Sequence, residues 1–154
     1  MSARSTEPGR FRPNDPVTQG EVIDAMYRMA GSPTVINQYG QPLQGRDASS
    51  EWVLSNGILP VSGYLNLNSP VTRQDIALML SRLATALRLK YPVIRDTPAF
   101  ADEWEIEPAA RTPVINLFRA GIINGRSAST FVPLGNMTRA EFATVMYRFN
   151  EGMS

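Results

Sequence analysis

The side chains that could carry chemistry in this chain of 154 residues are carboxylates, lysine, tyrosine and serine, because the sequence contains no Cys and no His. Thiol nucleophiles, Ser-His-Asp triads, imidazole acid-base catalysis and zinc sites built on Cys or His are therefore excluded. The densest group of carboxylates is the acidic run 102–107, and paired carboxylates are what glycosidases and metal sites need. The run lacks the pattern of a calcium loop and has no partner acid that the sequence places at catalytic distance. We expect a solvated loop or helix entry there, no metal site, no cofactor and no enzyme.

The overall composition favours one folded domain with few long-range charge effects. Hydrophobic residues make up 43% of the chain, and 15 Lys and Arg against 14 Asp and Glu leave a formal net charge of +1. No sequence-wide basic field exists to hold a polyphosphate backbone, so nucleic acid is not an expected partner. The longest apolar stretches, such as 76–80, fall far short of the about 20 residues of a membrane span. The first residues lack the apolar core of a secretory signal, so the chain either stays inside the cell or is a piece of a longer exported protein.

Three segments of the chain repeat a common pattern that predicts the start of a helix. In each, a Thr is followed three residues later by an acid, which is the spacing of a capping box, with Asp as a shorter stand-in in the second copy. The pairs are Thr18 with Glu21, Thr72 with Asp75 and Thr138 with Glu141. The apolar residue before each Thr also has an apolar partner at the fourth helical position, which predicts a hydrophobic staple. Apolar residues then recur at helical spacing, so the three segments predict core-facing helices of roughly three turns.

A second helix is expected before the cap in the two later copies. Residues 113–120 have a helical apolar pattern that ends at Gly121, and residues 51–56 form a shorter counterpart that ends at Gly57. The repeat unit is therefore helix, Gly-Ile turn, extended loop and capped helix, and the first copy lacks its leading helix. The fold class that follows is mainly α, built from tandem helical hairpins.

On these motifs the chain resembles a tandem of S-layer homology (SLH) domains, over roughly residues 9 to 149. The third copy carries the ordered set: an F-x-D opening, a G-I-x-x-G turn, an F-x-P loop and a T-R-A-E helix start, at 100–102, 121–125, 131–133 and 138–141. The resemblance implies two and a half repeats in a pseudo-threefold arrangement. The expected divisions are a tail at 1–10, a partial repeat 1 at 11–33, repeat 2 with a shortened first helix at 34–90, a linker at 91–95, repeat 3 at 96–149 and a tail at 150–154.

The resemblance implies binding rather than catalysis, at the surface or wall of a bacterium. SLH modules bind secondary cell-wall polysaccharide, often carrying an acidic pyruvyl ketal, in grooves between neighbouring repeats. The Arg of the T-R-A-E motif is the usual contact for the acid, which points to Arg73 and Arg139; Gln19 cannot supply that charge in the first repeat. The alternative function is a protein-interaction or surface-assembly subunit with degenerate sugar sites. Its partner would be a second copy of the chain or an S-layer or other surface protein.

The two arginines also have a structural alternative. An anion near a helix N-terminus gains from unpaired amide groups and the helix dipole, and Arg adds a planar fork for a carboxylate. The acid could equally be a side chain of the next repeat, which would make Arg73 and Arg139 members of structural ion pairs. For Arg28, Arg82 and Arg148, near the ends of the expected helices, a structural role is favoured, since a cation suits the dipole there.

The remaining candidates come from aromatic, acidic and glycine positions. Trp52 and Trp104 could stack on a sugar ring, although large aromatic residues more often fill a core. Asp47 and Asp102 could accept hydrogen bonds from a sugar, with a structural role in a loop or cap favoured. Gly63 and Gly125 are expected to serve tight turns, with close approach of the backbone to a ligand as the alternative.

Overall fold

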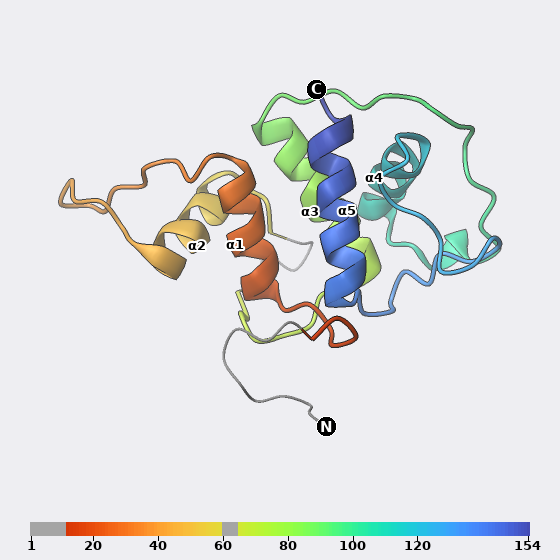
Figure 1. The fold of residues 1–154 in the computed structure, drawn as a ribbon, viewed down its shortest axis with the longest axis horizontal. Coiled ribbons are helices and arrows are strands. Elements are labelled where there is room, and N and C mark those ends of the chain that lie inside the picture. Colours follow the sequence, from red (N-terminus) through yellow and green to blue (C-terminus); the bar gives the residue numbers. More distant parts are fainter. Residues whose placement is uncertain (1–11, 60–64) are drawn as a thin grey trace.

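The computed structural model describes residues 12–59 and 65–154, and over these residues it has helices and no strand. The α-helices are α1 (Gln19–Met29), α2 (Gly45–Ser55), α3 (Arg73–Ala86), α4 (Pro108–Arg119) and α5 (Arg139–Gly152), with one 3₁₀ turn, η1 (Glu103–Glu105). In the view of Figure 1, α3 and α5 occupy the centre, with the pair α1 and α2 on one flank and α4 on the other. The mainly α fold class is confirmed.

The three Thr caps are confirmed, and they differ in completeness. Thr18 and Thr138 each form a full capping box, because Glu21 and Glu141 reach back to the amide of the cap residue. At α3 only half of the box forms: the hydroxyl of Thr72 accepts from the amide of Asp75 at 3.3 Å. The Asp side chain is one methylene shorter than Glu, which accounts for the missing return bond.

The leading helices are longer than the sequence pattern predicts. The helix expected over 51–56 begins at Gly45, so α2 has 11 residues against 12 in α4, and the prediction of a shortened first helix in repeat 2 is wrong. Likewise α4 begins at Pro108, where a missing amide is harmless, and Pro113 lies inside the helix rather than near its start. The helix start was obscured in both copies because few apolar residues lie in the first turns.

Both Gly-Ile turns are confirmed as helix ends. Gly57 and Gly121 have φ of 66° and 78°, in the left-handed region that suits glycine. The next residues, Ile58 and Ile122, donate their amides back to the carbonyls of Val53 and Leu117 and are buried. Each turn therefore ends one helix and returns the chain to the core.

The segments before the three caps are joined in a closed ring of backbone hydrogen bonds. The amide of Val17 donates to Met137, that of Met137 to Val71 and that of Val71 to Val17, at 2.9, 3.1 and 3.3 Å. Each segment thus pairs with both of the others, and the same three residues are fully or nearly buried. The starts of α1, α3 and α5 are held together at this ring.

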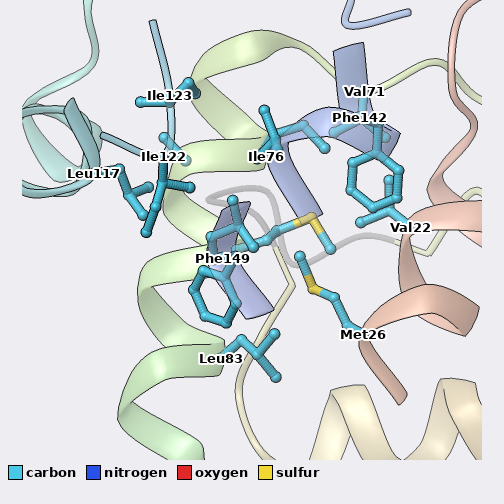
Figure 2. Close-up of a cluster of buried hydrophobic side chains, with 14 of the residues drawn as sticks. Val22, Met26, Val71, Ile76, Leu83, Leu117, Ile122, Ile123, Phe142 and Phe149 are labelled. Carbon is cyan, nitrogen blue, oxygen red and sulfur yellow. The ribbon is translucent and has the colours of Figure 1, made fainter. Parts of the chain in front are cut away.

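One hydrophobic core connects all the helices. Helix α2 packs on α1, and α4 packs on α3. Figure 2 shows residues of the three Thr-capped helices meeting with residues of α4 and of the Gly-Ile turn after it: Val22, Met26, Ile76, Leu83, Phe142, Phe149, Leu117, Ile122 and Ile123. The expected tail at 150–154 is part of this unit, because α5 continues to Gly152 and Met153 is buried.

Candidate ligand-binding groove

A groove of about 340 Å³ lies where α3, α5 and the loop after α4 meet. Its polar lining comes from all three: Arg73, Asn124, Gly125, Glu141, Thr144 and Arg148. It therefore joins the T-R-A-E position of repeat 2 to the G-I-x-x-G turn and second helix of repeat 3. Two of the residues singled out from the sequence, Arg73 and Gly125, are brought together here.

Arg73 forms part of the groove wall and is only 3% exposed. Its guanidinium donates to the carbonyls of Phe131, at 2.8 Å, and Asn124, and it pairs with Glu141 at 3.2 Å. The guanidinium carbon also lies 4.7 Å from the centre of the Phe131 ring. Burial lowers the pKa of Arg73, and the charge of Glu141 opposes that shift. Arg73 thus joins α3 to repeat 3, as the ion-pair alternative predicts.

Glu141 has all of its acceptor capacity occupied. Its carboxylate accepts from the amide of Thr138, from Arg73, and from two nitrogens of Arg126 at 2.9 and 3.0 Å. Burial alone would raise the pKa of Glu141, but the hydrogen bonds from Arg126 and Thr138 outweigh it and the pKa is lowered. The glutamate is therefore held as a carboxylate between two arginines.

Arg139 makes the corresponding contact to the first repeat. Its guanidinium pairs with Glu21, 118 residues away in sequence, and lines a separate hollow of about 270 Å³ with Asp15 and Thr18. Burial of Glu21 acts to raise its pKa, and the bonds from Arg139 and Thr18 lower it on balance. Each T-R-A-E arginine thus pairs with the third helical residue of the next capped helix.

The amides at the starts of the capped helices are already occupied. At α3, the amides of Arg73 and Gln74 donate to the carbonyls of Gly135 and Pro133, and at α5 those of Arg139 and Ala140 donate to Asp15 and Pro13. The sequence-based argument that unpaired amides would attract an anion there is wrong, because carbonyls of the neighbouring loops take their place. The cation at each helix start is compensated by an internal glutamate.

Asp102 and Gly125 shape the loop beside the groove. The carboxylate of Asp102 accepts from the amides of Phe131 and Val132 at 2.9 and 2.8 Å, which is the structural role favoured from the sequence. A Cβ on Gly125 would lie 2.5 Å from the carbonyl oxygen of Ser127 and 2.6 Å from that of Thr130. Gly125 is therefore required by a tight turn, and it also lines the groove.

The two tryptophans have opposite environments. Trp52 is 9% exposed and packs against Tyr27 in the core, with the ring centres 6.0 Å apart, which is the role favoured from the sequence over stacking on a sugar. Trp104, in η1, is 73% exposed and lines a separate hollow of about 220 Å³ with Phe100 and Arg111. The surrounding acidic run is an exposed helix entry, as expected.

Two other candidates and Gln19 remain. Asp47 is exposed in the first turn of α2, and Gly63 lies outside the described residues. Gln19, which replaces the T-R-A-E arginine in repeat 1, is buried and accepts from the amide of Asn66 at 2.7 Å. Next to it, the guanidinium of Arg46 occupies the space where a side chain on Gly20 would begin.

One groove residue was assigned otherwise from the sequence, and two arginines that bond to groove residues were missed. Arg95, in the linker, donates to the carbonyls of Phe118 and Ile123 and to the side chain of Asn124. Arg126 follows the G-I-x-x-G turn and pairs with Glu141. Arg148, favoured for a role at a helix end, lines the groove instead. No local pattern marks the first two, because the tertiary fold alone brings them here.

Two further features of the described residues bear on the expected partners. No helix in the part of the chain that the structure describes has the length and apolar character needed to cross a membrane. Among residues 12–59 and 65–154, no group of three or more acidic side chains is placed to hold a metal ion.

Comparisons with known proteins match these features. The model of a family described as "S-layer homology domain" matches residues 99–143, which include Asn124, Gly125 and Glu141 of the groove. An amylopullulanase of Thermoanaerobacterium thermosulfurigenes is 27% identical over 143 residues, which cover 90% of this chain and 8% of the relative. The exoglucanase XynX of Acetivibrio thermocellus is 31% identical over 80 residues, 52% of this chain and 7% of the relative. The chain therefore spans less than a tenth of the length of these two curated relatives.

Proposed function

We propose that this chain, which carries an S-layer homology domain at residues 99–143, attaches non-covalently to the bacterial cell wall by binding an acidic secondary polysaccharide. Anchoring in general is the role of such domains, and it fits a cell-surface protein that is not itself an enzyme. The enzymatic names of the two relatives refer to proteins more than ten times longer than the matched segment.

The observation that carries the acidic specificity is the charge around the groove between repeats 2 and 3. Arg73 and Arg148 line the groove, and its one carboxylate, Glu141, is already paired with Arg73 and with Arg126 beside the groove. A surplus of guanidinium groups beside a concave surface favours an anionic ligand, because guanidinium binds carboxylate through paired hydrogen bonds. A pyruvyl ketal would provide such a carboxylate on a sugar ring.

The closed hydrogen-bond ring supports the pseudo-threefold arrangement implied by the repeats. Three equivalent cap segments contact one another in turn, and the two T-R-A-E arginines make equivalent ion pairs to the following repeat. In such an arrangement the grooves lie between neighbouring repeats. Gln19 lacks the charge, and the hollow at Arg139 is smaller, at about 270 Å³ against about 340 Å³, which favours the groove at Arg73 as the principal binding site.

The test is co-sedimentation of the wild-type chain with purified bacterial cell walls, before and after chemical removal of the secondary polymer. Binding that disappears with the polymer is the expected result. A folded chain that sediments with neither preparation contradicts the proposal. Retained binding after removal would assign the wall contact to peptidoglycan and contradict it as well.

A second candidate function, surface assembly, is favoured by one face of α5. Ala77 and Leu78 of α3, the helix on which α4 packs, are buried, whereas the equivalent Ala143 and Thr144 of α5 are exposed, and Tyr147 is 67% exposed. Within the described residues no helix covers this face. Light scattering that gives the mass of a stable dimer or larger oligomer, together with absent wall binding, would favour assembly over anchoring.

A further inference from the structure

We propose that Arg148 is the residue that binds the carboxylate of the saccharide in this groove, while Arg73 builds the groove wall. The inference rests on the proposed function and reassigns the charge contact from the T-R-A-E motif to the second helix of repeat 3.

Arg73 and Arg126 already have internal partners. Both pair with Glu141, and Arg73 also donates hydrogen bonds to the carbonyls of Phe131 and Asn124. Arg126 also donates to the carbonyl of Asn136 at 2.6 Å. A ligand that recruited either guanidinium would have to displace an internal partner.

Arg148, unlike Arg73 and Arg126, has no internal partner among the described residues. Its side chain lines the groove and is exposed, and among the described residues it forms no hydrogen bond or ion pair. It lies four residues before the end of α5, and it does not cap the helix: the capping amide, from Met153, donates to Phe149. An exposed guanidinium at a groove, without an internal acceptor, can bind an incoming carboxylate without breaking an existing contact.

A second cation beside Arg148 strengthens the site. Arg95 is bonded only to neutral acceptors, the carbonyls of Phe118 and Ile123 and the side-chain oxygen of Asn124, and it stacks 3.7 Å from the centre of the Phe118 ring. Burial lowers the pKa of Arg95, and the like charge of Arg148 lowers it further. Through its bonds to Ile123 and Asn124, which line the groove, Arg95 adds positive charge at this edge, and such a charge favours an anion nearby.

The rest of the lining fits a sugar that carries the acid. Thr144 supplies a hydroxyl and Asn124 an amide, whereas Ile123 and Val145 supply apolar surface for the C–H groups of a ring. The volume of about 340 Å³ accommodates a monosaccharide residue with one substituent. The ligand class is therefore a carboxylate-bearing hexopyranose unit of a polymer.

The experiment is isothermal titration calorimetry of the full chain with a purified, pyruvylated secondary polymer, intact or with its ketals removed by mild acid. Three variants are compared with the wild type: Arg148→Gln, Arg148→Lys and Arg88→Gln. Arg88→Gln is the matched control, because Arg88 is exposed after α3, does not line the groove and loses the same charge. Circular dichroism checks that each variant is folded.

We expect the wild type and Arg88→Gln to bind the intact polymer about tenfold or more tightly than the treated one, since a hydrogen bond to a charged group contributes about 1.5–3 kcal/mol. Arg148→Gln should lose this preference while keeping the affinity for the treated polymer, and Arg148→Lys should retain part of it. An Arg148→Gln variant that still prefers the intact polymer would overturn the inference and leave the proposed function standing. A wild type that binds neither form would overturn both the proposed function and the inference about Arg148. A wild type that binds both forms equally would overturn only the claim that the groove recognises a carboxylate, and with it the role of Arg148.

Discussion

Arg73 and Glu141 form an ion pair although 68 residues separate them, with Nη1 of the arginine 3.2 Å from Oε2 of the glutamate. The pair joins the first residue of α3 to the third residue of α5. Arg139 and Glu21 repeat this relationship between α5 and α1. The arginine of the T-R-A-E motif therefore connects a repeat to the next one, in addition to any part it has in binding.

Replacement of Arg73 by alanine should strongly destabilise the fold. It would leave the carbonyls of Phe131 and Asn124 without their donor and remove one of the two arginines from Glu141, and an unsatisfied buried acceptor costs about 1–3 kcal/mol. Arg139→Ala is the comparison variant, with an expected loss of up to about 1 kcal/mol because its pair is more exposed. Urea unfolding followed by circular dichroism measures both. Equal losses in the two variants would contradict the structural role assigned to Arg73.

The lowered pKa of Glu141 predicts a loss of stability in acid. A carboxyl group whose pKa is lower in the folded chain contributes stability that is complete above its unfolded pKa of about 4.3 and is lost as the pH falls through the folded value. Glu141→Gln should therefore reduce the melting temperature at pH 7 and make its decline below about pH 5 shallower. Glu151→Gln, at the exposed end of α5, is the control and should reproduce the wild-type profile.

Asp75 should act in the opposite direction. Burial, followed by the nearby charge of Glu107, raises its pKa, so its charged form costs stability at every pH well above that value, and the cost disappears in acid. Asp75→Asn should raise the melting temperature at pH 7, with a gain that shrinks toward pH 3. A gain that stays constant across this range would trace to packing rather than to charge.

Gly125→Ala should destabilise the loop beside the groove. The new methyl group would lie within 2.6 Å of two backbone carbonyl oxygens, which cannot move without opening the turn, and such overpacking costs about 1–3 kcal/mol. Gly152→Ala, with no heavy atom within 4 Å of its added carbon, is the matched control and should be neutral. Thermal unfolding of the two variants checks the difference. Similar melting temperatures for both would show that the turn has room to adjust.

The helix caps and turns, which are determined by residues close together in the sequence, could be predicted from the sequence. Thr18, Thr138 and their glutamates form the expected boxes, and Gly57 and Gly121 end their helices, because caps and turns are set by local backbone geometry. The start of α4 was placed at Pro113 instead of Pro108, since only the later turns carry an apolar pattern.

The charges of the groove could be predicted only in part. Arg73 and Gly125 were found because they belong to repeated motifs, and the ion-pair alternative for Arg73 identified the right class of partner. Arg95 and Arg126 lie in a linker and a loop with no repeated pattern, and only the folded chain brings them to Asn124 and Glu141. Whether Trp52 faced the core or the solvent also depended on packing against Tyr27.

The hydrogen-bond ring constrains how the chain can be made. Val17 donates to Met137, so a bond near the beginning of the described chain is completed only by a residue near its end. In an open solenoid each repeat can settle on the one before it, and folding can spread along the array. Here the first cap segment cannot form its bond to the third one until Met137 has left the ribosome. Until then the first capped helix lacks one of its two partners in the ring. Closure of a long loop is then the expected slow step of folding, and a premature stop before Met137 would leave the ring open.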